Sequence, residues 1–199
     1  MREYNLRTYK EIDWSVVDKA PIDTFKWTTG GYTPHCFAQC ALLENVGLCV
    51  KLTAYEKNPR AVHENFNDPV CTDSCLEFFA AFEEGSDQYV NFEFNSKGTC
   101  LATLRGPRGP VVTIDNIISV PKIKAEVFEE YWTVEFLLSF ADIKALFPKA
   151  NIEKGASFHA NFYKCGDETE IPHYGMWNEV MCDPPNFHAP QFFGKINIC

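Results

Sequence analysis

Residues 75–95 read CLEFFAAFEEGSDQYVNFEFN and contain two segments, 75–82 and 89–95, in which apolar and polar side chains alternate. One face of the two segments together carries only apolar residues: Leu76, Phe78, Ala80, Phe82, Val90, Phe92 and Phe94. A period of two is that of a β-strand with one face in the core. The stretch therefore predicts two strands with one strongly apolar face each.

The same alternation recurs along the chain and sets the expected fold class. Further strands are predicted over residues 36–43, 46–55, 99–104, 131–138 and 157–163. A helix is expected over 141–147, where Pro148 stops it, and a helix over 122–130 is a weaker alternative. Many short strands separated by turns favour an all-β antiparallel β-sandwich or barrel with one short helix. The expected core contains Phe78, Phe92, Phe94, Trp132, Phe136 and Phe158.

The absence of a repeat, low-complexity tract or linker predicts one domain over residues 1–199, with residues 1–35 irregular. A net charge of −9 argues against a nucleic-acid partner, which needs clustered cations. No apolar run is long enough for a membrane span, and the N-terminus shows no signal peptide. We therefore expect a cytoplasmic protein with no membrane partner, whose nine cysteines are reduced thiols.

A polar set lies opposite the apolar faces of three predicted strands: Glu77, Asn91, Glu93, Asn161 and Tyr163. If these strands are neighbours, the set forms one surface of carboxylates, amides and an aromatic ring. Sugars need this mixture, because their hydroxyls require donors and acceptors and their apolar faces require a flat ring. The alternative interpretation is an outer sheet face exposed to solvent.

Two other groups of residues are of the types that form chemical centres. Asp73, Glu77 and Glu93 offer the acid and base of a glycoside hydrolase, although nothing fixes their separation. The residues Cys165, His173, Cys182 and His188 are of metal-ligand type, but their spacing lacks the short pairs of zinc sites. No phosphate loop, nucleophile elbow or H-E-x-x-H motif occurs, so no catalytic residue or cofactor is assigned.

The C-terminal segment 173–194 (HYGMWNEVMCDPPNFHAPQFFG) concentrates aromatic residues around the stiff turn 183–186. It is either a rigid binding loop or a cap on the core.

Several motifs in order resemble the family 9 carbohydrate-binding modules, in the branch called family 9-like, which have a DOMON-like sandwich. They are 73–79 (DSCLEFF), 91–95 (NFEFN) with Gly98, 132–135 (WTVE), 161–166 (NFYKCG), 173–177 (HYGMW) and 187–194 (FHAPQFFG). The similarity runs from about Trp27 to the C-terminus.

The resemblance implies a β-sandwich that recognises saccharides without catalysis. Characterised members hold a terminal sugar between two tryptophans with help from an acidic residue and amides, and some hold structural calcium. Matched by motif, Glu77 would accept sugar hydroxyls and Trp177 would be the later stacking ring, with Asn161 and His173 as further candidates. Because members usually accompany glycoside hydrolases, the resemblance also implies a link to saccharide catabolism.

The sequence departs from the family pattern at two places. Cys71 occupies the position that often carries the other tryptophan, and the strand 89–95 lacks an arginine. Trp27 and Tyr89 are the aromatic residues that could substitute. With one ring missing, we expect weak binding, with a Kd on the order of 0.1 mM or above. An interaction or structural protein built on a degenerate sandwich is the remaining alternative.

Overall fold

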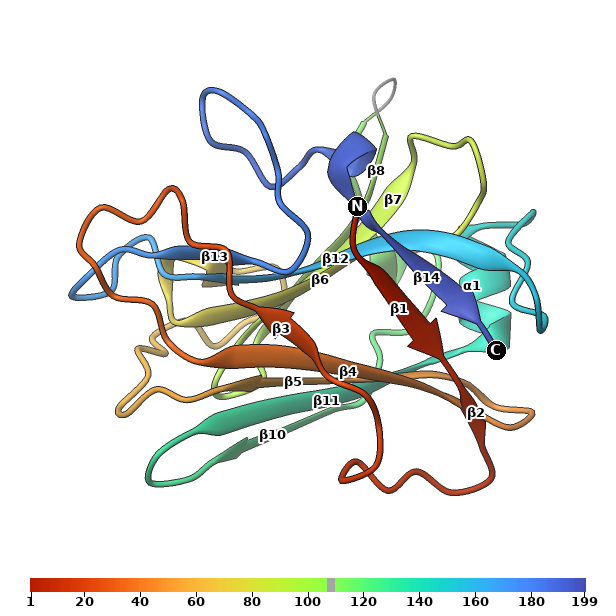
Figure 1. Ribbon diagram of the computed structural model, residues 1–199, viewed down its shortest axis with the longest axis horizontal. Coiled ribbons are helices and arrows are strands. Elements are labelled where there is room, and N and C mark those ends of the chain that lie inside the picture. The colour runs from red at the N-terminus through yellow and green to blue at the C-terminus, as the bar shows by residue number, and fades with distance from the viewer. Residues whose placement is uncertain (107–109) are drawn as a thin grey trace.

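The structure, a computed structural model, describes residues 1–106 and 110–199. Two β-sheets face each other as the layers of a sandwich, one above the other in Figure 1. In sheet order, the first sheet contains β1 (Glu3–Leu6), β14 (Gly194–Ile198), β12 (Ser157–Cys165), β6 (Cys75–Ala81), β7 (Tyr89–Asn95), β8 (Cys100–Arg105) and β9 (Val112–Thr113), with β13 (Tyr174–Met176) paired to β12. The second contains β10 (Ile123–Val127), β11 (Trp132–Ser139), β5 (Gly47–Ala54), β4 (Cys36–Leu43) and β2 (Thr8–Tyr9), with β3 (Ala20–Ile22) paired to β4.

The all-β sandwich predicted from the alternation is confirmed. Neighbouring strands pair antiparallel except at two places, where β1 pairs with β14 and β2 with β4 in parallel. Both sheets are therefore mixed at their margins. The N-terminal chain joins them, since β1 belongs to the first sheet and β2 to the second.

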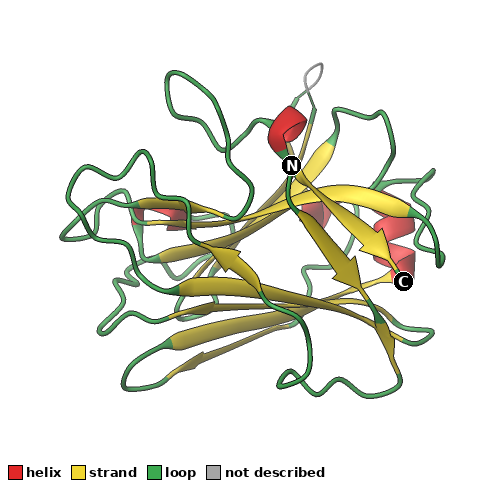
Figure 2. Cartoon of the chain, viewed as in Figure 1, coloured by secondary structure: helices red, strands yellow, loops and turns green. Residues whose placement is uncertain are grey.

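Helical structure is sparse in the described chain, as Figure 2 shows. The α-helix α1 spans Phe140–Leu146, close to the predicted range. Ser139 caps it, because its side chain accepts a hydrogen bond from the Asp142 backbone while the Asp142 carboxylate accepts one from the Ser139 backbone. Single 3₁₀ turns occur at η1 (Val70–Thr72), η2 (Ile114–Asn116) and η3 (Pro190–Phe192).

Phenylalanine rings from both sheets form the core between them. Phe136 of β11 lies 5.1 Å from Phe92 and 4.9 Å from Phe94 of β7, measured between ring centroids. All six residues predicted for the core belong to one buried cluster, so the predicted strand faces are correct. Burying rings of this size provides much of the free energy that opposes unfolding.

Two expectations about secondary structure were wrong. Residues 1–35 contain β1, β2 and β3, which are too short for a periodic signal and form only by pairing with β14 and β4. The segment 122–130 contains β10, not a helix, because Ile123–Val127 continue the register of β11. No helix in the described ranges is long and apolar enough to cross a membrane.

The outer face of the first sheet positions the site. Glu77, Asn91, Glu93, Asn161 and Tyr163 lie there, on β6, β7 and β12, and all are buried. The segment 177–193, drawn in blue in Figure 1, passes over this side of the sheet. The polar set is thus the floor of a covered region and not a solvated sheet face.

Candidate functional site

A cavity of about 240 Å³ opens on the outer face of the first sheet. Strand residues form its floor, and the loops 23–35, 166–173 and 177–193 contribute its walls. The lining residues are Trp27, Cys71, Glu77, Glu93, Cys165, Asp167, Tyr174, Pro185, Asn186, Phe187 and His188.

Glu77 and Glu93 stand side by side on the floor, because they are directly opposite in the pairing of β6 with β7. Glu77 Oε1 accepts a hydrogen bond from Cys165 Sγ at 2.9 Å, and Glu93 Oε1 accepts one from Asn91 Nδ2 at 2.8 Å. Burial raises the pKa of Glu93 to about 7. Burial, with the neighbouring Glu93 carboxylate, raises the pKa of Glu77 well above its ordinary value. Simultaneous ionisation of both carboxyl groups is therefore unfavourable.

Asn91 does not face the cavity but orients Glu93. Its Oδ1 accepts hydrogen bonds from the Thr103 hydroxyl and from Arg105 Nε, the latter at 3.2 Å. These contacts fix the amide so that its Nδ2 points at the Glu93 carboxylate. A carboxylate held in this way can accept a ligand hydroxyl with little loss of side-chain entropy.

Aromatic rings form one wall. Trp27 and Phe187 are half-buried and lie 5.3 Å apart between ring centroids, tilted by 33°. Phe187 in turn stacks on Tyr163 of β12 at 4.1 Å, and the Tyr163 hydroxyl donates to the Phe187 carbonyl at 3.2 Å. Tyr163 thus supports the wall from behind, while Trp27 keeps surface available to a ligand.

Asp167 and His188 complete the lining. Burial raises the pKa of Asp167. The Tyr89 hydroxyl lies 2.9 Å from His188 Nδ1, and the histidine ring stacks on Phe79. Burial, with a smaller contribution from the Arg105 charge, lowers the pKa of His188 to about 4, so this ring is neutral at neutral pH.

Trp177 does not present a face to a ligand, so its interpretation as the stacking ring is wrong. Only 2% of its surface is exposed, and its ring centroid lies 5.4 Å from that of Phe162. A Cβ atom added at Gly194 would come within 2.3 Å of the Trp177 ring, which shows how closely β14 approaches it. Trp177 is part of the sandwich core, as the alternative view of the C-terminal segment predicted.

His173 and Asn161 also have structural surroundings. His173 is fully buried, and its Nε2 accepts a hydrogen bond from Lys164 Nζ at 2.6 Å, while Nδ1 donates to the Ile171 carbonyl at 2.8 Å. Asn161 Nδ2 donates to the Asn178 carbonyl, and its Oδ1 accepts from the Asn178 backbone. Neither residue lines the cavity, so both hold the chain around it.

The four residues of metal-ligand type, Cys165, His173, Cys182 and His188, do not form one cluster, in agreement with their spacing. Cys165 and His188 line the cavity, but His173 does not, and the cluster of three close ligand atoms found in the described residues is Cys75, Glu77 and Cys165. Calcium prefers six to eight oxygen ligands. Two thiols and one carboxylate do not match this preference, so this cluster does not fit calcium.

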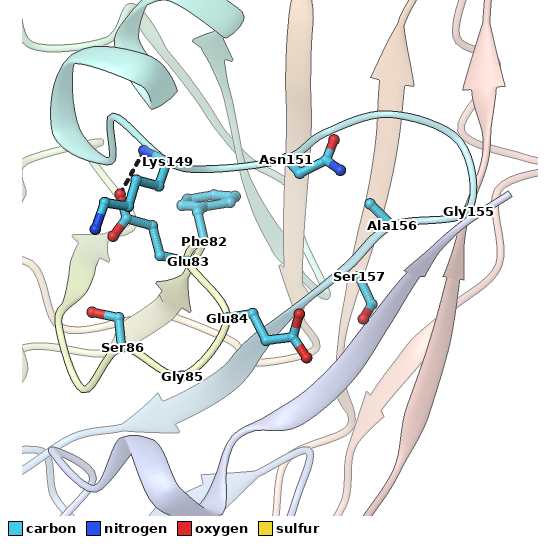
Figure 3. A pocket seen from close by; sticks show the side chains of 10 residues that line it. All are labelled: Phe82, Glu83, Glu84, Gly85, Ser86, Lys149, Asn151, Gly155, Ala156 and Ser157. Carbon is cyan, nitrogen blue, oxygen red and sulfur yellow. Dashed lines mark hydrogen bonds between the residues drawn. The ribbon is translucent and has the colours of Figure 1, made fainter.

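A larger cavity, of about 580 Å³, lies elsewhere and is shown in Figure 3. The loops 83–86 and 149–157 surround it, and Lys149 N donates to Glu83 Oε1 at 2.7 Å. Its aromatic residue, Phe82, is 1% exposed and offers no stacking surface. The smaller cavity combines carboxylates with accessible rings and is therefore the candidate site.

Comparison with known proteins places the chain in a family. The family model described as "Carbohydrate-binding family 9" matches residues 8–198. The chain belongs to carbohydrate-binding family 9. This family consists of binding modules and is not a family of enzymes. No curated protein matches the chain by sequence.

Solved structures similar to this family 9 chain share its fold. A protein from Bacteroides uniformis ATCC 8492, provisionally described as carbohydrate-binding, is 24% identical with a TM-score of 0.80, and the match covers 99% of both chains. A family 9 module from Caldicellulosiruptor kristjanssonii in complex with glucose is 12% identical with a TM-score of 0.69, covering 100% of this chain and 96% of the other. A family 9 module from the same organism in complex with cellotriose is 11% identical with a TM-score of 0.65, covering 99% and 93%.

Some lining residues of this family 9 chain were not among those predicted from sequence. Asp167 lies in the irregular segment after β12, and Tyr174 begins the three-residue strand β13, which is too short for a periodic signal. Trp27, which the sequence offered together with Tyr89 as a substitute for the missing tryptophan, does line the cavity, whereas Tyr89 is not one of the lining residues. Phe187 and His188 belong to the segment singled out for its aromatic residues.

Proposed function

We propose that this chain binds a terminal sugar of a mono- or oligosaccharide in the cavity between Trp27 and the Glu77–Glu93 pair. Trp27 would stack on the apolar face of the sugar, and the carboxyl groups would hydrogen-bond its hydroxyls. Family membership supports saccharide binding in general, and the glucose and cellotriose complexes of the similar modules support a hexose as the first probe.

One observation carries this proposal: a half-buried tryptophan and two buried carboxyl groups converge on the same small cavity. Its volume of about 240 Å³ lies below the range of drug-sized pockets, roughly 300–1,000 Å³. This size favours one sugar unit over a long chain lying along a groove. Cys71 occupies the family's second tryptophan position and provides no flat ring, so stacking is one-sided and affinity is weak, with a Kd on the order of 0.1 mM or above.

We further propose that the chain serves saccharide breakdown by bringing a partner enzyme to its substrate, which membership of a binding family supports. We also propose a cytoplasmic location and a single binding domain over residues 1–199. The continuous core cluster between the two sheets supports the single domain.

A glycoside hydrolase using Glu77 and Glu93 is a second candidate, favoured by the raised pKa of both groups. Directly opposite residues of an antiparallel pair have Cβ atoms about 4.5–5.5 Å apart. This spacing is too short for an inverting hydrolase, whose carboxyl groups are about 6.5–9.5 Å apart, but it suits a retaining one, in which they are about 5–5.5 Å apart. Membership of a carbohydrate-binding family weighs against catalysis.

Calorimetric titration with glucose, cellobiose and cellotriose tests the proposal, with the protein in a chelator-containing buffer. We expect saturable binding that Trp27→Ala abolishes. A release assay with aryl glycosides, run in parallel, should show no turnover. Absence of binding across a wider saccharide screen would favour an interaction protein on a degenerate sandwich.

A further inference from the structure

The floor of the cavity contains a compact group of metal-ligand atoms. Cys75 Sγ, a Glu77 carboxylate oxygen and Cys165 Sγ all lie within 4.8 Å of one another, and all three residues are buried. Tetrahedral zinc has sulfur ligands at about 2.3 Å and carboxylate oxygen at about 2.0–2.2 Å, so one ion requires its ligands to be separated by about 3.5 Å. The three atoms are thus close to the spacing that one ion would need.

Strand register creates this group. Cys75 and Cys165 are directly opposite in the pairing of β6 with β12, and Glu77 follows Cys75 by two residues on the same face. The ladder hydrogen bonds of two central strands hold the three positions. The donors are therefore pre-arranged on regular strands, which suits a defined site better than mobile loops do.

The lining of the cavity is acidic, and the cationic groups that act on Glu77 and Glu93, Lys164 and Arg105, are not among its lining residues. Glu77, Glu93 and Asp167 line the cavity, and no lysine or arginine occurs among the described residues that line it. The Glu77 carboxylate accepts a hydrogen bond from the Cys165 thiol, which is a weak donor. Buried carboxylates are ordinarily paired with a cation or bound to a metal.

We propose that Cys75, Glu77 and Cys165 bind a thiophilic divalent cation of the zinc class at the floor of the cavity. Two thiolates and one carboxylate suit zinc and exclude calcium or magnesium as the preferred ion. Because Glu77 and Cys165 line the cavity, the fourth position of such an ion faces the cavity and is open to water or a ligand oxygen. Binding displaces the thiol protons to solvent, and no oxidation or reduction occurs.

Cobalt(II) is the probe, because a cobalt–thiolate bond gives a charge-transfer absorption band in the near ultraviolet. The full chain, freshly reduced with a phosphine and free of chelator, is titrated with CoCl₂ and then with ZnCl₂. We expect one equivalent to bind with this band, zinc to displace cobalt, and zinc to raise the Tm. No saccharide is present, so this result is independent of saccharide binding.

Variants locate the site. Cys165→Ser, Cys75→Ser and Glu77→Gln should each lose the band or weaken cobalt binding, with near-ultraviolet circular dichroism confirming that each variant folds. Cys71→Ser is the matched control, because its thiol lines the same cavity but lies outside the cluster. Cys199→Ser controls for the exposed thiol.

Two outcomes overturn the proposal. One is a reduced wild-type protein that shows no charge-transfer band at saturating cobalt. The other is a band that survives in folded Cys75→Ser and Cys165→Ser but disappears in Cys71→Ser or Cys199→Ser.

Discussion

Phe187 stacks on Tyr163 with ring centroids 4.1 Å apart, and this contact joins the C-terminal loop to the outer face of β12. The Tyr163 hydroxyl reinforces it by donating to the Phe187 carbonyl at 3.2 Å. The loop that closes the cavity is therefore anchored to a central strand by a ring and a hydrogen bond. Phe187 also contacts Trp27, so the anchor and the proposed stacking surface are continuous.

Removing this anchor should impair binding more than folding. Phe187→Ala leaves Trp27 without its neighbour, and we expect saccharide affinity to fall about tenfold, equivalent to about 1.4 kcal/mol. Because Phe187 is only half-buried, the free energy of unfolding should fall by about 1–2 kcal/mol, less than for a full core truncation. Calorimetric titration and urea denaturation of the same preparation measure the two effects. A large loss of stability with unchanged affinity would contradict this assignment.

Trp177 should behave in the opposite way. Trp177→Ala removes a ring that is 2% exposed and should lower the free energy of unfolding by about 3–5 kcal/mol. Denaturant melts check this value. Trp14→Ala is the control, because Trp14 is half-buried outside the core and should change stability far less. A near-silent Trp177→Ala would restore this residue as a candidate ligand contact.

His173 should make stability depend on pH. Burial, with the nearby Lys164 charge, lowers its pKa from 6.5 to about 4 in the folded protein, although Glu56 acts in the opposite direction. Between these pH values the unfolded chain binds a proton that the folded chain does not, so stability falls as pH drops below about 6.5. Between neutral pH and a pH below both values, this histidine alone should lower the free energy of unfolding by about 3 kcal/mol.

His173→Gln should remove this contribution, since glutamine keeps an acceptor for Lys164 but does not titrate. His188, whose pKa is also lowered to about 4, supplies a slope of the same sign that remains in the variant. Denaturant melts at pH 4, 5, 6 and 7 span the interval between the folded and unfolded pKa values. They give the free energy of unfolding of the wild type and the variant at each pH. An unchanged slope in His173→Gln would show that other groups control the acid sensitivity.

The carboxylate pair should contribute unequally to stability and binding. Glu93→Gln keeps an acceptor for Asn91 Nδ2 and relieves the crowding of two buried carboxyl groups, so the Tm should stay equal or rise. Saccharide affinity should fall, because hydrogen bonds to a charged group contribute about 1.5–3 kcal/mol. Scanning calorimetry with and without saccharide separates the two effects. A Tm that falls sharply without saccharide would mean that the Glu93 charge stabilises the fold.

The sequence was sufficient for the sandwich and for its core, because alternation assigns each strand face directly. Phe78, Phe92 and Phe136 needed no knowledge of strand order. The edge strands β1 to β3 escaped prediction because their stability comes from partners distant in sequence, such as β14. The local sequence of each short strand does not reveal its distant partner.

The site was predictable only where it is built on strands. Glu77 and Glu93 followed from their register on β6 and β7, since a polar residue between apolar neighbours must face outward. Trp177 was misplaced because a tryptophan in an irregular segment can point either way, and the close approach of Gly194 decides its direction. Trp27 is brought to the cavity by folding of a loop distant in sequence.

One measurement tests the central claim most directly. The protein contains four tryptophans, and each gives one indole N–H resonance in a ¹⁵N-correlated spectrum, with Trp27→Phe identifying the resonance of Trp27. Titration with glucose and then cellotriose should shift the Trp27 indole progressively and leave those of the buried Trp132 and Trp177 unmoved. A saccharide that binds while the Trp27 resonance stays fixed would contradict the account.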